Sequence, residues 1–360
     1  MSTQPDLLYS EEEEALRSAV RDLLTDRGGP AAVIARTESD APHDIALWKT
    51  LADAMGLAGL LIPEELDGQG ATHREAAVVL EELGRAVAPV PYLTSAVVAT
   101  EALLECGADD LLAQLASATT VGALAVGLHT APGAPFATVR TERGVLYGEL
   151  TGIADAAVAD LLLVPADDGG LYAVDASAVT VTPQVSLDLT RPLATVTLDG
   201  AAGRRLGDAE PAVRRALRAA AGLLASEQLG LAEWALTETV RYLKERKQFN
   251  RPVGGFQALK HRLAQLWLEV VNLRAAARAA ADALASGEDA DVAVAVAQAY
   301  AAPAAVRAAE EALQLHAGIG MTWEHPIHLY LKRAKADSIA YGTAGAHREA
   351  LAELVDLRAP

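Results

Sequence analysis

Positive charge is concentrated in one short segment of an otherwise acidic chain. The 360 residues carry a formal net charge of −18, yet segment 244–262 holds six basic residues against the single acidic Glu245. Such a focused patch can bind a small anion, and the alternative is a solvated loop whose charges serve solubility. The basic residues of the patch are Lys244, Arg246, Lys247, Arg251, Lys260 and Arg262.

The surroundings of the patch favour a phosphate group. The sequence predicts a helix that ends near Glu245, a turn at NRPVGG, and a new helix that begins near Phe256. Arg246 would then lie beside an aromatic ring and the free amides of a helix amino terminus. A guanidinium binds phosphate oxygens in a bidentate manner, and the helix dipole favours negative charge at that end. A broad nucleic-acid surface is excluded, because it would need many more basic residues.

A second stretch, QLHAGIGMTWEHPIHLYLKRAKA, occupies residues 314–336. Gly318 and Gly320 have no side chains, so another group can approach their backbone closely, although glycine also ends ordinary helices. His316, His325 and His328 are the kind of residue that binds metals. No matching carboxylate pattern accompanies them, so we predict that the chain has no metal site.

Three blocks of different composition must position these stretches. Residues 1–118 are predicted to be helical, with capping boxes at Ser10/Glu13 and Thr72/Glu75. Residues 119–206 contain seven short Val- and Thr-rich runs separated by turn residues, which predict a small antiparallel sheet or barrel. Residues 207–360 are Ala-rich, with apolar positions at spacings of three and four, which predict a four-helix bundle. The predicted fold class is mainly α with a central β-domain.

Other features narrow the class of protein. Cys106 is the only cysteine, so an internal disulfide framework and a zinc site built on several thiolates are excluded. The acidic N-terminal segment has no apolar signal core, and we expect no membrane-spanning run elsewhere. We therefore expect a cytoplasmic protein.

Taken together, the two stretches resemble the acyl-CoA dehydrogenase family. The pattern R-x-Q-F-x-x-P-x-x-x-F-Q begins at Arg246, and Q-x-x-x-G-x-G begins at Gln314. The segment LLIPEELDGQGATHREAAVVLEELGRA is similar to the N-terminal helical domain of that family, so the likeness extends over the whole chain. The resemblance implies FAD as cofactor and α,β-dehydrogenation of an acyl-CoA thioester.

The resemblance also implies which residues hold the ADP half of FAD. In the family the first stretch often reaches across a subunit interface to the pyrophosphate, and the second contacts the adenosine end. The cofactor-binding residues implied here are Arg246, Gln248, Phe249, Phe256, Gln257, Gln314, Leu315, His316, Ala317 and Gly318.

The chain departs from the family where the chemistry takes place. The family places its catalytic Glu at one of two positions, which here hold Tyr341 and Ala220. Tyrosine is a poor base at neutral pH because its ordinary pKa is about 10. Glu227 and Glu349 each lie about two helical turns from these positions. We predict that the chain has no catalytic base.

The β-domain departs from the family as well. The family loop T-E-P-x-x-G-S-D is replaced by GLHTAPGAP, and no Trp occurs between Trp48 and Trp234. The chain thus resembles the non-catalytic subunit of the heteromeric, α₂β₂ acyl-CoA dehydrogenases with which actinobacteria shorten steroid side chains by β-oxidation. A homologous partner would supply the base, the flavin-ring site and most of the substrate pocket. The alternatives are a homomeric flavoenzyme with an unconventional base and a flavin-free helical interaction protein.

Overall fold

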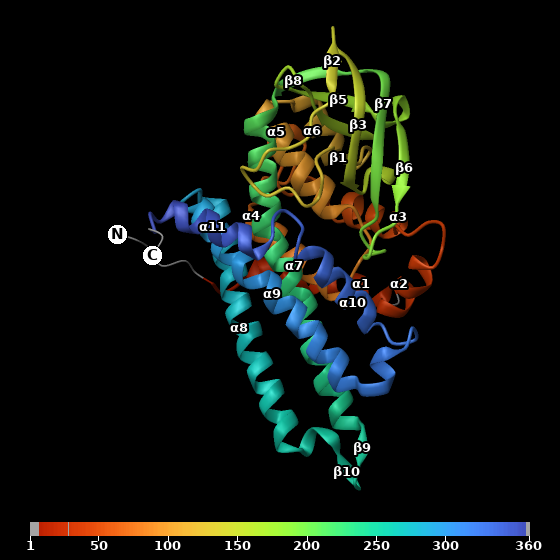
Figure 1. Cartoon of the computed structure of the whole chain (residues 1–360), viewed down its shortest axis with the longest axis vertical. Helices are drawn as coiled ribbons and strands as arrows, with labels where there is room; N and C mark the ends of the chain where they lie inside the picture. Colours follow the sequence, from red (N-terminus) through yellow and green to blue (C-terminus); the bar gives the residue numbers. More distant parts are fainter. Residues whose placement is uncertain (1–6, 28, 358–360) are drawn as a thin grey trace.

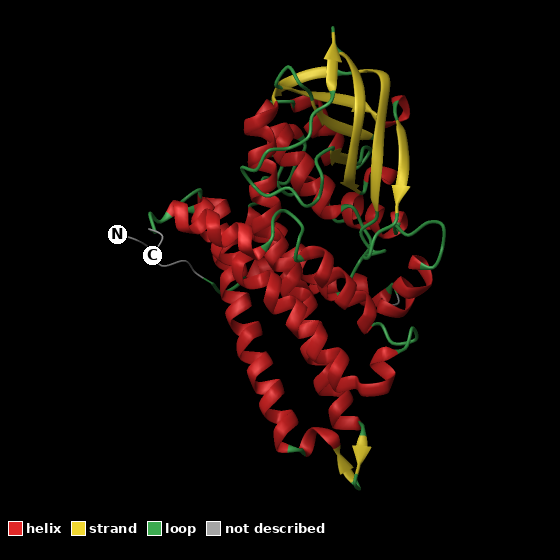
Figure 2. Cartoon of the chain, viewed as in Figure 1, coloured by secondary structure: helices red, strands yellow, loops and turns green. Residues whose placement is uncertain are grey.

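The computed structural model describes residues 7–27 and 29–357, in which helices, then two β-sheets, then long helices follow one another. The sheets lie at one end of the elongated molecule, and the long helices extend to the opposite end (Figure 1, Figure 2). This order confirms the predicted fold class, mainly α with a central β-domain.

The N-terminal helices begin where the sequence places their caps. The backbone N–H of Glu13 donates to Ser10 Oγ at 3.1 Å, and the Glu13 carboxylate accepts from the Ser10 N–H at 2.7 Å. Thr72 and Glu75 form the equivalent capping box at the start of α4. The helices of this part are α1 (Glu11–Asp26), α2 (Gly29–Thr37), α3 (Ile45–Lys49), α4 (His73–Arg85), α5 (Thr100–Cys106) and α6 (Asp109–Ala116).

Two four-stranded sheets form the β part, with strand orders β1-β4-β5-β8 and β2-β3-β7-β6. The prediction of a purely antiparallel sheet is wrong for one pair: β1 and β4 are parallel, because the chain between them forms β2 and β3 of the other sheet. An eighth strand, β8, was not expected from its polar sequence RRLGD. The strands are β1 (Gly122–Leu124), β2 (Arg140–Glu142), β3 (Val145–Ala154), β4 (Leu161–Pro165), β5 (Gly170–Asp175), β6 (Thr180–Gln184), β7 (Leu193–Ala202) and β8 (Arg204–Asp208).

The C-terminal part is built on three long helices, α7 (Ala209–Glu245), α8 (Gln257–Ser286) and α9 (Ala290–His316). Buried alanines such as Ala301 and Ala308 let the helix axes approach closely. Two shorter helices, α10 (Ile327–Asp337) and α11 (Ala344–Leu354), pack on α9 and complete the bundle.

Helix α7 connects the two ends of the molecule. Its 37 residues span about 55 Å at 1.5 Å per residue. It crosses α4 at two glycines: a Cβ on Gly230 would lie 2.0 Å from the Glu81 carbonyl oxygen, and one on Gly84 would lie 2.2 Å from that of Glu227. Only glycine permits this contact, which fixes the position of α7 against the N-terminal helices.

In the part of the chain that the structure describes, one helical stretch, 290–321, is long and apolar enough to cross a membrane. It contains α9, whose alanine-rich face is buried against α7 and α8. Packing in the bundle therefore accounts for its composition.

Candidate cofactor-binding site

A small hairpin forms the tip of the bundle, at the end far from the sheets (Figure 1). Strands β9 (Lys247–Gln248) and β10 (Arg251–Pro252) are joined by Phe249 and Asn250, whose φ angles are 52° and 59°. Two positive φ angles match a type I′ turn, which begins one residue before the predicted NRPVGG segment. Phe249 is 87 % exposed. A bulky aromatic residue in this strained conformation and open to solvent is expected where a ligand or partner covers it.

The basic patch at this tip is accessible. Arg246 is exposed, and in the described part of the chain its guanidinium has no ion pair or hydrogen bond. Helix α8 begins without a side-chain cap, so its first amides remain open to an anion. Arg251 lies over the Phe256 ring at 3.8 Å from the centroid. Gln248 and Gln257 are exposed beside these groups.

The second predicted stretch lies at the end of α9. Gln314, Ala317 and Gly318 are exposed, whereas Leu315 and His316 are buried. The side chains of the last two therefore do not face solvent, and only their backbone could contact a ligand bound from outside at this end of α9. The helix ends because Ala317 adopts a positive φ of 53°.

The fold brings the two stretches together. Tyr242, one turn before Arg246 on α7, stacks on the His316 ring at 4.6 Å between centroids. Arg262 on α8 pairs with Glu311 on α9 at 2.6 Å. Tyr242 was missed from the sequence, although its spacing of four residues from Arg246 places both on one helix face.

The two positions that we predicted to correspond to the family Glu lie at the other end of α7. Ala220 is buried in α7, and Tyr341 is buried between α10 and α11. The Tyr341 N–H donates to the Leu128 carbonyl at 2.7 Å. The cavity that Tyr341 lines with Leu128 and Leu217 measures about 10 Å³, room for one water molecule at most. Burial raises the pKa of Tyr341 above its ordinary value, so the hydroxyl stays protonated at neutral pH and even less phenolate is available to accept a proton.

A buried ionic cluster lies near Tyr341 and connects the loop before β7 to the bundle. Arg333 contacts Glu227 at 2.6 Å and Asp188 at 2.5 Å. Arg191 contacts Glu227 at 2.6 Å and Asp337 at 2.7 Å. Both oxygens of Glu227 thus face arginines, which makes it unsuitable as a base.

The fold shifts the pKa values of two carboxyl groups in this cluster in opposite directions. Burial acts to raise the pKa of Glu227, but Arg191 and Arg333 outweigh it and the net shift is downward. Burial and the neighbouring Glu227 raise the pKa of Asp337 well above its usual value. Three carboxyl groups face two arginines in this cluster, and Asp337 is the one whose raised pKa favours the protonated form.

Comparison with known proteins identifies the chain. Residues 10–123 match the family description "Acyl-CoA dehydrogenase, N-terminal domain", and residues 211–355 match "Acyl-CoA dehydrogenase, C-terminal domain". Acyl-CoA dehydrogenase IpdE2 of Mycolicibacterium smegmatis is 37% identical over 333 residues, which cover 92% of this chain and 95% of that protein. The chain belongs to the acyl-CoA dehydrogenase family. Its homologues are oxidoreductases that act on CH–CH donors.

Solved structures confirm the acyl-CoA dehydrogenase fold. The ChsE4-ChsE5 complex from Mycobacterium tuberculosis contains a chain that matches with a TM-score of 0.87 and 29% identity, covering 99% of this chain and 100% of that one. A Tcur3481-Tcur3483 steroid ACAD variant matches with a TM-score of 0.84 and 31% identity, and the match covers 96% of this chain and 98% of that one. Structural neighbours of this acyl-CoA dehydrogenase therefore include heteromeric complexes.

Membership of the acyl-CoA dehydrogenase family implies FAD, and the tip of the bundle fits its ADP half. The unpaired Arg246 and the uncapped amides of α8 suit a pyrophosphate, and the exposed Gln314 and Gly318 can contact an adenosine. Tyr341 itself lines the cavity of about 10 Å³ described above. Ala220 and Arg246 are 26 residues apart, which corresponds to about 39 Å along the axis of α7. The basic tip and the position of Ala220 therefore lie far apart in one chain.

Proposed function

We propose that this acyl-CoA dehydrogenase is the subunit without a catalytic base in a heteromeric, FAD-dependent enzyme. The observation that carries the proposal is the contrast between an exposed, unpaired Arg246 and a buried Tyr341 in the position of the base. The partner is a homologous catalytic subunit, in an α₂β₂ assembly, that supplies the carboxylate and most of the acyl-CoA pocket. Bound FAD would accept the hydride that leaves the β carbon of the thioester while that carboxylate removes the α proton.

The residues of this chain then serve to bind and orient the cofactor. Arg246 and the amides of α8 would bind the pyrophosphate, with Phe249 and Phe256 against the ADP half. Gln248 and Gln257 would donate further hydrogen bonds, and the loop Gln314–Gly318 would contact the adenosine. The heteromeric neighbours support this assignment, and the steroid ACAD among them makes a steroid-derived acyl-CoA the first substrate to test. The domain boundaries 1–118, 119–206 and 207–360 and the cytoplasmic location remain predictions.

Expression of the chain with and without its partner tests the proposal. We expect the chain alone to be colourless, and the complex with a homologous catalytic subunit to be yellow, with about one FAD for each pair of unlike subunits. The measurement is the flavin absorbance of the purified proteins. A chain that is yellow alone and bleaches with an acyl-CoA would support the homomeric alternative. Colourless protein in both preparations would support the flavin-free one.

Replacement of Tyr341 by Phe tests whether this chain supplies a base. Because the hydroxyl faces no room for an acyl chain, we expect kcat/KM of the complex to stay within about twofold, whereas loss of an acid–base residue costs about 10²–10⁴-fold. The steady-state rate with acyl-CoA is the measurement, and the urea midpoint shows that folding is unchanged. A hundredfold loss at unchanged stability would make Tyr341 part of the catalytic machinery.

A further inference from the structure

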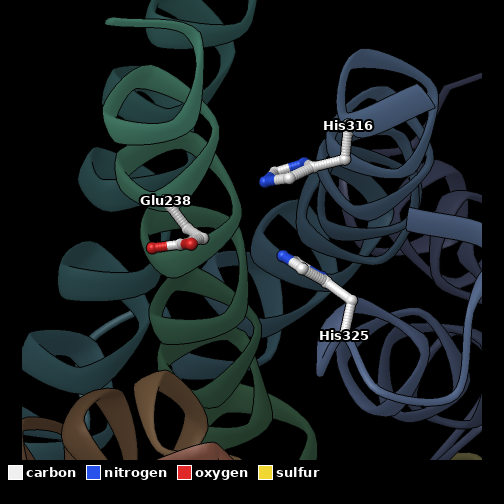
Figure 3. Close-up of side chains that lie close together, drawn as sticks. All are labelled: Glu238, His316 and His325. Atoms are coloured by element: carbon white, nitrogen blue, oxygen red, sulfur yellow. The ribbon is translucent and has the colours of Figure 1, made fainter. Parts of the chain in front are cut away.

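We propose that Glu238, His316 and His325 form a binding site for a divalent transition metal, with Zn²⁺ as the best match. Each residue offers one ligand atom, and these atoms all lie within 4.8 Å of one another. Figure 3 shows the two rings extending from neighbouring segments toward α7, which carries Glu238. The prediction of no metal site rested on the lack of a carboxylate pattern that matches the histidines in sequence; the fold supplies a carboxylate from another helix.

His316 is already arranged as a metal ligand. Its Nδ1–H donates to the Ala312 carbonyl at 2.7 Å, which leaves the lone pair on Nε2. The ring is 0 % exposed, and Nε2 has no hydrogen-bond partner in the described ranges 7–27 and 29–357. A buried acceptor without a partner is rare and costly, and a metal ion would satisfy it. Metal-binding histidines commonly donate their other N–H to a backbone carbonyl in this way.

His325 supplies the second imidazole. Its ring centroid lies 4.5 Å from that of His316. The Ile327 N–H donates to His325 Nδ1 at 3.3 Å, so Nε2 is the atom that faces a metal. Binding there requires the neutral tautomer with its proton on Nδ1 instead of Nε2, at the expense of this long hydrogen bond.

Glu238 supplies the negative charge. Both of its oxygens accept from Arg241, Oε2 from Nε at 2.9 Å and Oε1 from a terminal guanidinium nitrogen at 2.5 Å. A carboxylate offers about four acceptor sites, so each oxygen keeps a lone pair for a metal. The positive Arg241 opposes a cation, but its side chain is 56% exposed and is screened by water. Arg241 also pairs with Glu245, which can hold it if it leaves Glu238.

The ligand set selects the ion. Two imidazoles and one carboxylate match zinc sites that keep a fourth position for water, and nitrogen ligands disfavour Mg²⁺ and Ca²⁺. Zinc bonds of about 2.0–2.1 Å in a tetrahedron place ligand atoms about 3.4 Å apart, so the three groups must close by up to about 1.4 Å. Glu238 and His325 are only partly buried and can rotate by this amount, whereas His316 is fixed by Ala312 and Tyr242. The ion would fasten the end of α9 and the loop before α10 to α7.

Zinc binding to the full-length chain tests the site. After treatment with a chelator, the protein is titrated with ZnCl₂ in competition with a chromophoric chelator of known affinity. We expect about one Zn²⁺ per chain for the wild type, and an affinity at least about tenfold lower for His325→Ala and for Glu238→Gln. His328→Ala is the matched control. His328 lies three residues after His325, and its ring contacts the Trp323 carbonyl. We therefore expect this substitution to leave the Zn²⁺ affinity unchanged.

The melting temperature gives a second readout. Zn²⁺ should raise it for the wild type and for His328→Ala, and should raise it less for the other two variants, because a ligand that binds only the folded state stabilises that state more strongly the tighter it binds. The site does not depend on the proposed function, since no flavin is present in the assay. Absence of stoichiometric binding by the wild type would overturn the proposal. Equal losses of Zn²⁺ affinity in His325→Ala and His328→Ala would overturn it as well.

Discussion

Replacing Arg246 by Ala should remove most of the FAD from the co-expressed complex. The guanidinium is exposed and unpaired in this chain, so its binding capacity is available to the pyrophosphate. A hydrogen bond to a charged group contributes about 1.5–3 kcal/mol, which corresponds to FAD binding weakened by about 10–150-fold. The measurements are the flavin-to-protein ratio after gel filtration and an FAD titration of the deflavinated complex.

The controls for Arg246 lie in the same basic segment. Arg262→Ala removes an arginine that already pairs with Glu311 on the surface, an interaction worth about 0–1 kcal/mol, and should leave FAD binding unchanged. Arg246→Lys keeps the positive charge but loses the planar guanidinium that can donate two hydrogen bonds to one phosphate. Its affinity for FAD should therefore fall between those of the wild type and Arg246→Ala. If Arg246→Ala retains FAD as well as the wild type does, the assignment of this residue to the pyrophosphate is wrong.

The features that could be predicted from the sequence are local. Ser10 and Thr72 cap helices through residues three positions away, so their pattern is visible in the sequence. The basic tip between α7 and α8 was predicted for the same reason, since helix ends and turns depend on neighbouring residues. The one-residue shift of the turn to Phe249 and Asn250 arose because a phenylalanine with positive φ is not expected from propensity.

The features that escaped prediction depend on distant contacts. The parallel pairing of β1 with β4 depends on the route of the chain through a second sheet. Glu238 reaches His316 only because α7 and α9 pack side by side. The ionic cluster likewise joins Arg191, Glu227 and Arg333 from separate parts of the chain. A charged residue in a sequence is ordinarily expected at the surface, so nothing local indicates that these side chains are buried together.

Replacing Glu227 by Gln should lower the free energy of unfolding by about 3–5 kcal/mol, because Arg191 and Arg333 would be left buried with one carboxylate fewer. Asp337→Asn is the matched variant. The pKa of Asp337 is raised by burial and by Glu227, which favours its neutral form, so a neutral amide of the same shape should cost far less than the loss of Glu227. Urea unfolding at pH 7 measures the free energy of unfolding of both variants. The comparison is valid if the dependence of that free energy on urea concentration is the same as in the wild type.

The pH dependence of the two variants separates the roles of the two carboxyls. The pKa of Glu227 is lowered by folding, so its contribution to stability is present above its unfolded pKa of about 4.3 and is lost as pH falls through the folded pKa. The pKa of Asp337 is raised, so its contribution is fully present below an unfolded pKa of about 3.9 and declines as pH rises toward the folded pKa. Asp337→Asn should therefore gain stability relative to the wild type as pH rises from about 4, while Glu227→Gln should lose it. Equal losses at pH 7 would mean that both carboxyls are ionised, and the cluster would then carry a net negative charge inside the protein.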